Sequence, residues 1–358
     1  GGTEPGQPPS AMSRFDEGVI FPCVKIAEKG KIKRDLEYII ERDTRAPVYW
    51  LLDNRAKMGG VDIIDAGVKE LIKEYGLDYF SKAIYEQIED TRRACLKKVR
   101  KCLFPGTYRS VTYLDVPLEG KPVRNAKNHE IAYPVEMTVA PDGNVSIDFS
   151  GTSPAGWHSY NCSLHALNAV AVTTVIQNLI YDLKLNQGIF QSILKNMKVP
   201  PSAINPPSLF YSTCTWVSAM MACTSLLACI SRSQYIMGMR EEVASSGGCT
   251  STMVVGGTDQ HNRQFASVVF ESGCCGMSAT AVCDGIDTCT APWNPEGDCG
   301  DVELWERTFP MMYLGRRIHP DEGGFGKYRG GNGLESLYFI EHTDDFEAGS
   351  IISADRVF

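Results

Sequence analysis

Residues 131–149 read IAYPVEMTVAPDGNVSIDF, and this stretch decides the fold class of the chain. Apolar and polar residues alternate on both sides of the segment 141–144, whose sequence PDGN is rich in turn formers. Strict alternation is typical of half-buried β-strands, and a short turn between two such runs indicates a hairpin. We therefore predict a β-hairpin over 131–149 and a further strand over 107–116.

The sequence before this hairpin has a different period. From about Ile32 to Lys101 apolar residues recur every three or four positions, most clearly over 64–75, which predicts helices. We expect Gly76 to end one of these helices and Asp78 to cap the next.

The change of period near residue 105 predicts an α+β fold. A helical region at 1–105 should precede a mixed β-sheet body at 106–358 that contains buried helices and long glycine-rich loops. The run 164–183 is apolar almost all round, which is typical of a fully buried helix. Shorter alternating runs predict strands, and they cover 252–255, 266–270 and 335–340.

The stretch 199–231 carries no charged residue. A membrane-spanning helix needs about 20 predominantly apolar residues. Prolines and hydroxyl residues interrupt this stretch and leave 216–230 as its best apolar run. We therefore predict a buried helix there, in the interior or at a subunit contact, and no membrane-spanning segment.

Composition limits the class of protein. The chain has 358 residues and a formal net charge of −8, which argues against nucleic-acid binding. The first ten residues show no features of a signal peptide. The 13 cysteines form no CxxC pair, so we interpret them as buried thiols in a reducing cytoplasm, consistent with an oxygen-poor habitat. The alternative for the adjacent pair Cys274-Cys275 is redox activity.

Polar residues concentrate where the predicted hairpin ends. Asp148 ends the second strand, and Ser150 and Thr152 follow it. Such an exit from a strand can present a carboxylate and hydroxyls to a pocket, so we predict that Asp148 is catalytic and that the two hydroxyl residues bind substrate. The alternative is a turn in which these side chains only cap the following loop.

The same loop supplies two further candidates. His158 is predicted to be catalytic, because it lies in a polar loop and histidine is the commonest general acid or base. Asn161 is predicted to bind substrate. His165 begins the apolar run that follows, so we interpret it as a hydrogen-bonded core histidine.

A second polar loop lies at 293–301 and concentrates carboxylates among turn formers. Paired carboxylates can bind metal or act as acid and base. We predict that Glu296 is catalytic and that Asn294 binds substrate. An exposed acidic loop is the alternative.

The sequence contains no complete metal or nucleotide site of its own. The six histidines lack paired spacing, so we predict no metal ligands here; the alternative is convergence of His158, His165 and a loop carboxylate. The glycine-rich run 323–333 fails the P-loop pattern and predicts tight turns. The chain alone should hold no metal by elemental analysis and hydrolyse no ATP.

Several collinear motifs carry a resemblance that covers nearly the whole chain. They are GGTEPGQPPS (1–10), EGVIFPCVKIAEKG (17–30), LFPGTY (103–108), VSIDFSGTSPAG (145–156), LNQGIF (185–190), VPPSAINPP (199–207) and GKYRGGNGLES (326–336). In this order they resemble the B subunit of the hydantoinase/oxoprolinase family. WNPEGDCGDVELWE (293–306) with YLGRR (313–317) is more similar to the ATP-dependent acetone and acetophenone carboxylases than to the amide hydrolases.

The resemblance implies a division of labour. A partner similar to hydantoinase A would bind Mg-ATP and phosphorylate the substrate oxygen, with a small third subunit in the complex. For a ketone, the activated enol phosphate would then be carboxylated by CO2 derived from bicarbonate. The alternatives are the B subunit of a hydantoinase or 5-oxoprolinase that opens a cyclic amide, and a non-catalytic scaffold.

The resemblance also implies a divalent metal, either Mn, Zn or Fe, in the full subunit. The family's metal ligands lie ahead of a glycine pair that matches Gly1-Gly2, so we expect them outside this chain. On this resemblance the chain is an internal part of a longer B-type subunit that acts only in a hetero-oligomer in the cytoplasm.

Overall fold

A four-stranded sheet forms the centre of the protein in a computed structural model, which describes residues 11–17, 19–21, 23–44, 47–115, 130–213, 217–241, 251–269, 274–289 and 300–352. The sheet contains β3 (Gly106–Asp115), β4 (Glu130–Val139), β5 (Val145–Asp148) and β6 (Met197–Lys198), in that order. Alternate residues of β4 are buried, and β4 pairs antiparallel with β5. The predicted hairpin over 131–149 is therefore confirmed.

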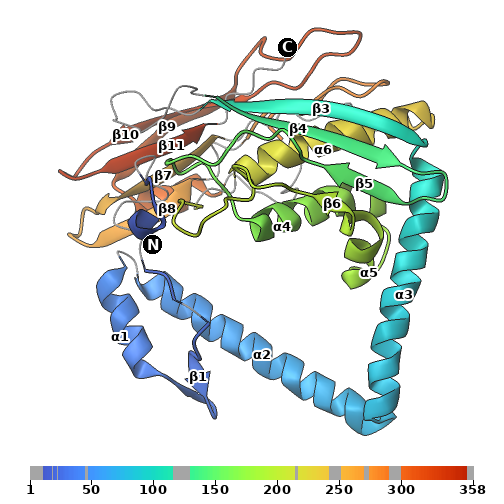
Figure 1. The fold of residues 1–358 in the computed structure, drawn as a ribbon. Coiled ribbons are helices and arrows are strands. Elements are labelled where there is room, and N and C mark those ends of the chain that lie inside the picture. Colours follow the sequence, from blue (N-terminus) through green and yellow to red (C-terminus); the bar gives the residue numbers. More distant parts are fainter. Residues whose placement is uncertain are drawn as a thin grey trace.

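The uncharged stretch forms the helix that covers this sheet. The helix α6 (Val217–Ile236) lies along β3 and β4, and 17 of its 20 residues are buried (Figure 1). Its buried face explains why no charge occurs there, because an unpaired charge in a core is costly. No helix in the described part of the chain is long and apolar enough to cross a membrane.

Hydroxyl groups link α6 to the sheet inside this core. Tyr133 on β4 donates a hydrogen bond to Ser218 of α6 at 2.8 Å. Ser225, two turns further along α6, donates to the Tyr133 carbonyl oxygen at 2.8 Å and lies 2.9 Å from the hydroxyl of Thr112 on β3. We call these four residues the hydroxyl ladder. It satisfies polar groups that burial would otherwise leave unpaired.

The helix predicted over 164–183 is shorter and less buried than expected. The helix α4 (Leu164–Val175) continues into one π-helical segment, Ile176–Ile180, and buries one side, including Leu167 and Ala171. It packs on α6 from one side only, so its other side remains accessible. The short helix α5 (Gln187–Ile189) leads into a second π-helical segment, Phe190–Leu194.

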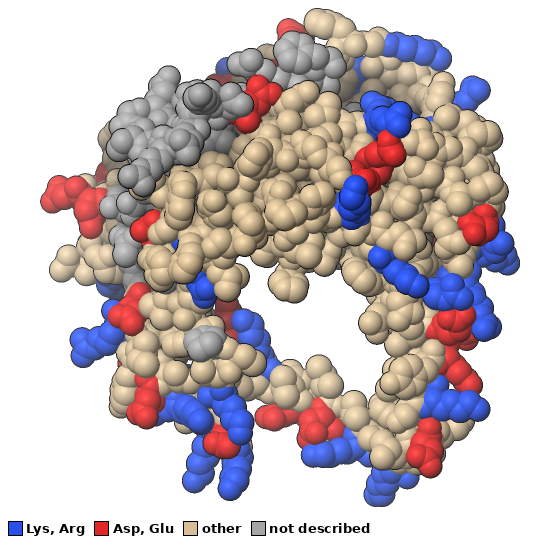
Figure 2. Space-filling view, in the orientation of Figure 1, with Lys and Arg blue, Asp and Glu red and all other residues tan. Residues whose placement is uncertain are grey.

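Three helices form an arm below the body, after a 3-10 turn at Arg14–Glu17 and the two-residue strands β1 (Ala27–Glu28) and β2 (Lys31–Ile32) (Figure 1). They are α1 (Arg34–Asp43), α2 (Pro47–Tyr75) and α3 (Leu77–Cys102). Figure 2 shows an opening bounded by α2, α3 and the body. The predicted cap at Asp78 is wrong: Gly76 occupies the N-cap with φ +82°, and Asp78 lies in the first turn of α3.

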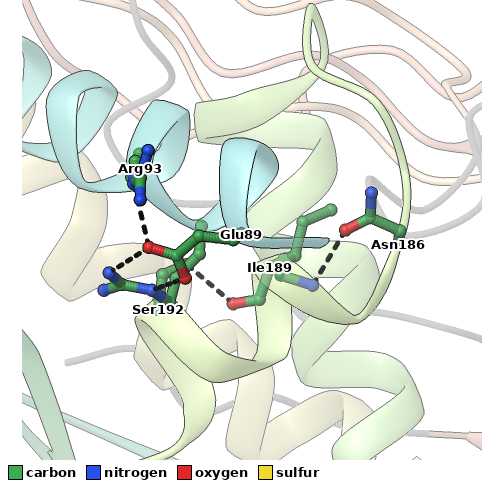
Figure 3. A network of polar contacts seen from close by, with 7 residues as sticks. Glu89, Arg93, Asn186, Ile189 and Ser192 are labelled. Carbon is green, nitrogen blue, oxygen red and sulfur yellow. Dashed lines mark hydrogen bonds and ion pairs between the residues drawn. The ribbon is translucent and has the colours of Figure 1, made fainter. Parts of the chain in front are cut away.

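The second half of α3 anchors the arm to the body. Cys95, Val99 and Cys102 enter the main core. Asn186, just before α5, donates to the hydroxyl of Thr91 at 2.8 Å and accepts from the Gly188 N–H at 2.8 Å. Figure 3 shows the contact of Asn186 with the Gly188 N–H and, beside it, Glu89 of α3, which accepts hydrogen bonds from Arg92 and Arg93 of its own helix. The apolar face of α3 is therefore buried only in its C-terminal half.

The rest of the body consists of two small antiparallel sheets. One contains β7 (Ser251–Thr258), β8 (Gln264–Val269) and β11 (Glu347–Ile352), and the other pairs β9 (Met311–Ile318) with β10 (Leu334–Ile340). The helix α7 (Val302–Thr308) packs beside β9. The strands predicted near 252–255, 266–270 and 335–340 are confirmed, and so is the α+β class.

The glycine-rich run 323–333 forms turns, as expected. Gly331 donates to the Met277 carbonyl oxygen at 2.8 Å, and Gly285 donates to that of Arg329 at 2.7 Å. A Cβ atom on Gly331 would collide with the carbonyl oxygen of Ile286. Glycine is required at this position because two backbone segments touch there.

The anchor between α3 and α5 generates a stability prediction. A Cβ on Gly188 would meet the backbone of Ile88 and Arg92, so Gly188→Ala should lower the free energy of unfolding by about 1–3 kcal/mol through overpacking. Urea denaturation measures the change. Gly315→Ala is the matched control, because that position on β9 faces open space and should change stability by less than about 1 kcal/mol. Equal effects of both variants would contradict the prediction.

Candidate functional site

The loop that leaves β5 carries most of the sequence-predicted site residues. Asp148 is the last residue of β5 and lies opposite Lys198 of β6 in the parallel register. One carboxylate oxygen of Asp148 accepts the Ser150 N–H at 2.7 Å, and the other lies 2.9 Å from the Lys198 Nζ. The Ser150 hydroxyl and the Lys198 ammonium hold the pKa of Asp148 below its usual value. Asp148 is therefore a carboxylate at neutral pH and an acceptor, not a proton donor.

The hydroxyl residues after Asp148 stabilise the turn. Thr152 donates to the Phe149 carbonyl oxygen at 2.9 Å, and Ser153 accepts the Ala132 N–H from β4 at 2.9 Å. The turn proposed as the alternative interpretation is thus present. Ser150 remains exposed, so its hydroxyl is accessible from solvent.

His158 is buried, with 9% of its surface exposed. Its Nδ1 accepts the Tyr160 N–H at 3.2 Å, which assigns the proton of the neutral ring to Nε2. Burial lowers the pKa of His158 to about 4, so the ring is neutral at pH 7. A Cβ on Gly156 would collide with Nε2, which explains the glycine there. Nε2 has no hydrogen-bond partner among the described residues and can donate to a ligand.

Asn161 is fully buried and fixes the loop. Its Nδ2 donates to the carbonyl oxygens of Gly156, His158 and Ser212, each at 2.9 Å, and its Oδ1 accepts the Gly156 N–H at 3.0 Å. These contacts use the polar atoms of the side chain within the protein. Asn161 therefore keeps no free side-chain donor for the predicted contact with substrate. Its contacts favour a role in positioning the loop.

Two segments distant in sequence complete the site: 208–213 contacts this loop, and 11–17 contacts 208–213. The ring of Trp157 packs on Tyr211, with 5.0 Å between the ring centroids. Arg14 donates through its backbone N–H to the Phe210 carbonyl oxygen at 3.0 Å, and Glu17 accepts the Thr213 N–H at 2.6 Å. The candidate site is thus built from 11–17, 148–161 and 208–213. Sequence analysis missed the first and third segments, because no local pattern reports such long-range contacts.

Ser212 is a polar residue that no pattern in the sequence singles out. It is fully buried, and its hydroxyl has no hydrogen-bond partner in the described part of the chain. Its carbonyl oxygen lies next to that of His158, because both accept from the same Asn161 nitrogen. Ser212 and His158 are therefore neighbours that both retain unused hydrogen-bonding capacity.

The structure does not test the two remaining predicted site residues. Asn294 and Glu296 fall within 290–299, outside the described residues. His165 is exposed on α4, so its interpretation as a core histidine is wrong: α4 turns that side away from α6. Within the described ranges, no three His, Cys, Asp or Glu side chains are grouped to hold a metal ion.

Several buried cysteines belong to the main core and take no part in the candidate site. Burial raises the pKa of the Cys223 and Cys229 thiols to about 12 and also raises that of Cys162. A thiol with a raised pKa is a poor nucleophile and metal ligand. These three residues fit the interpretation as small apolar core residues, but that interpretation is wrong for Cys23 and Cys283, which are exposed.

The sequence profile of the hydantoinase B/oxoprolinase family matches residues 1–357. The chain belongs to this family. The resemblance carried by the ordered motifs is therefore confirmed.

Two members of the family are ketone carboxylase subunits. The acetone carboxylase alpha subunit of Xanthobacter autotrophicus is 35% identical over 343 residues, which are 94% of this chain and 44% of that protein. The acetophenone carboxylase delta subunit of Aromatoleum aromaticum is 27% identical over 356 residues, covering 96% of this chain and 50% of that protein. The chain thus spans about half the length of these relatives.

Solved structures show the same fold. A nucleotide-free structure of acetone carboxylase superposes with a TM-score of 0.90 at 32% identity and covers 99% of this chain and 47% of that one. The ATP-dependent caprolactamase of Pseudomonas jessenii superposes with a TM-score of 0.73 at 21% identity, covering 94% and 57%, and shares the fold.

His158 generates a pH prediction. The pKa of the folded His158 ring, about 4, lies below the ordinary histidine pKa of 6.5, so between these values the unfolded chain binds the proton more readily. Stability should therefore be highest above pH 6.5 and fall by about 2 kcal/mol between pH 7.5 and 5. Urea denaturation at the two pH values should show a smaller fall for His158→Gln than for the unsubstituted chain.

The matched control is His165→Gln, because His165 is exposed on α4. This variant should lose as much stability on acidification as the unsubstituted chain. An unchanged fall in His158→Gln would show that the ring is not the group that links stability to pH.

The hydroxyl ladder generates a second prediction, because Ser218 also donates to the carbonyl oxygen of Tyr160 in the site loop. Ser218→Ala leaves the buried Tyr133 hydroxyl without its acceptor and should cost about 1–3 kcal/mol of unfolding free energy. Tyr133→Phe removes the donor itself and should cost less. Thermal unfolding of both variants tests the order, and a more stable Ser218→Ala would reverse it.

Proposed function

We propose that this chain is part of a subunit of an ATP-dependent ketone carboxylase of the acetone or acetophenone type. The observation that carries the proposal is a difference in sequence identity to two relatives. Identity to the acetone carboxylase alpha subunit is 35% over 343 residues, whereas identity to the caprolactamase beta subunit is 24% over 353 residues. The motif at 293–306 supports the same choice.

The proposed reaction needs a partner. An ATP-binding subunit similar to hydantoinase A, carrying Mg-ATP, would transfer the terminal phosphoryl group to the enolate oxygen of the ketone and release ADP. The enol phosphate would then form a carbon–carbon bond to CO2 derived from bicarbonate while its oxygen–phosphorus bond breaks. The phosphoryl group would pass to the hydroxide that bicarbonate releases with CO2, which yields phosphate. Because enol phosphates hydrolyse in water, the site must exclude solvent between the two steps.

Residues of this chain suit three parts of that task. The carboxylate of Asp148, paired with Lys198, stays ionised and can orient a donor or a cationic group. The Nε2–H of His158 can donate to a developing oxyanion from a neutral ring. Asn161 and Ser218 hold the loop that carries His158. Ser150, Thr152, Asn294 and Glu296 stay predictions for substrate contact and catalysis.

A divalent metal, either Mn, Zn or Fe, remains part of the proposal for the full subunit. The residues between 11 and 352 that the structure describes offer no set of three ligands, so they do not fit a resident ion. Its ligands are proposed to come from the part of the longer polypeptide that precedes the match to Gly1-Gly2. The abundant buried thiols support a location in the reducing cytoplasm.

The second candidate is an ATP-dependent hydrolase of a cyclic amide, favoured by the shared fold with caprolactamase. The decisive measurement supplies the assembled complex with ATP and labelled bicarbonate. Acid-stable label should appear with acetone or acetophenone. Turnover of hydantoin or 5-oxoproline without bicarbonate would instead establish the amide hydrolase.

Variants within this assay test the site. His158→Gln and Asp148→Asn should each lower the carboxylation rate at least about tenfold, since a positioned donor or acceptor typically contributes more than that. Glu296→Ala should do the same, and His165→Gln should not. Unchanged turnover in all three site variants would favour a non-catalytic scaffold, even if the complex fixes bicarbonate.

A further inference from the structure

A pair of cysteines that the proposed reaction does not use lies in the segment 274–289. Cys275 and Cys289 are opposed in an antiparallel β-bridge, and the Cys275 N–H donates to the Cys289 carbonyl oxygen at 2.8 Å. Residues paired in this way have Cα atoms about 5.5 Å apart. Cysteines joined by a disulfide have Cα atoms about 4.4–6.8 Å apart. The backbone therefore brings the two cysteines within the range that a disulfide requires.

Close backbone contacts hold this pairing in place. Next to Cys275, the Met277 N–H donates to the Ile286 carbonyl oxygen at 2.9 Å, which keeps the two arms of the segment together. A Cβ atom on Gly276 would collide with the carbonyl oxygen of Gly331. Glycine at 276 thus lets the segment lie directly against the glycine-rich run 323–333. The cysteine pair is therefore carried by backbone that is fixed on both sides.

The two cysteines also lie nearer to solvent than the cysteines of the main core. Cys275 and Cys289 are each half-buried, whereas Cys162 and Cys223 are buried in the core. Exchange with a disulfide requires a thiolate that the other molecule can reach. The backbone-paired cysteines meet this requirement, and the core cysteines do not.

We infer that Cys275 and Cys289 form a reversible redox site that is oxidised by a small-molecule disulfide such as oxidised glutathione. The thiolate of one cysteine attacks a sulfur of this disulfide and releases one glutathione. The thiolate of the other cysteine then displaces the second glutathione from the mixed disulfide. The protein pair loses two electrons and two protons, which end on the two glutathione thiols.

The backbone pairing also explains why this bridge is easily reduced. The Cβ atoms of a hydrogen-bonded antiparallel pair are about 5.5 Å apart, whereas a disulfide joins Cβ atoms about 3.8 Å apart. Oxidation must therefore draw the two arms together against the contacts of Gly276 and Met277. A bridge formed against its surroundings is labile. The pair is thus a thiol pair in a reducing environment and a disulfide when oxidised glutathione accumulates.

The bridge acts on predicted residues of the proposed carboxylase site. The segment 290–299, which carries Asn294 and Glu296, follows Cys289 directly. Joining Cys289 to Cys275 moves the residue from which this segment starts. A misplacement of about 1 Å can lower turnover about a hundredfold. This effect rests on the proposed function, whereas formation of the disulfide does not.

The first test equilibrates the intact chain with oxidised glutathione, without ATP or substrate. Acid quenching and alkylation of the remaining thiols precede digestion with a protease that cleaves before aspartate. This digestion separates Cys275 from Cys289, because Asp284 and Asp287 lie between them. Mass spectrometry should find the two peptides joined through these cysteines, and dithiothreitol should release them.

Matched variants assign the link. Cys275→Ser and Cys289→Ser should each abolish it, because each removes one sulfur and keeps a side chain of similar size. The control is Cys283→Ser, which changes an exposed cysteine of the same segment and should leave the link intact. Circular dichroism should show the same fold for all three variants.

The second test measures carboxylation by the assembled complex before and after oxidation. Oxidation should lower turnover at least about tenfold, because it displaces the start of the segment with Asn294 and Glu296. Dithiothreitol should restore the rate. A complex with Cys275→Ser should keep its turnover in the same oxidant.

Two results would overturn the redox site, whatever the activity of the complex. Cys275 and Cys289 could stay separate thiols in excess oxidised glutathione, or a link to Cys289 could persist in Cys275→Ser. Equal turnover of the cross-linked and reduced complexes would instead overturn the effect on the proposed site and leave the carboxylase proposal standing.

Discussion

The contact between α6 and the central sheet is the constraint on which the rest of the body depends. It is mainly apolar, but the hydroxyl ladder of Thr112, Tyr133, Ser218 and Ser225 runs through it. Apolar packing tolerates small shifts along a helix axis, whereas hydrogen bonds do not, because a displaced buried hydroxyl loses its partner. The ladder therefore fixes the register of α6 against β3 and β4, and through Ser218 it also fixes the site loop.

The residues of the candidate site lie on a loop that the surrounding structure holds in place. Asn161 binds the loop to itself and to the segment at 212, and the end of β5 holds Asp148 beside Lys198. Few side chains of the loop keep a hydrogen-bonding group that is free for a ligand. The backbone that carries them is held by hydrogen bonds within the protein. A site of this kind is preorganised, since little reorganisation is left for the moment of binding.

Local sequence patterns predicted the elements that show the same environment along a continuous run of residues. The hairpin over 131–149 followed from the alternation of apolar and polar residues, and the helix near 216–230 followed from an uncharged, apolar run. The cap at Gly76, the exposed His165 and the exposed face of α2 depend on contacts distant in sequence or absent from the chain. The loop 148–161 was identified as polar, but its neighbours at 11–17 and 208–213 could be found only from the fold.

The way α3 is held has a mechanical consequence. Only its C-terminal half is fixed in the body, by Cys95, Val99 and the ion pair of Lys98 with Asp182. With a rise of about 1.5 Å per residue, the free half from Leu77 to Asp90 makes a lever about 21 Å long. A tilt of about 5° at its base would then move the tip at Gly76 by about 2 Å. A small rearrangement around α5 would thus cause a larger displacement of α2. In the other direction, a force that moves α2 would act on the core through a smaller displacement and with greater strength.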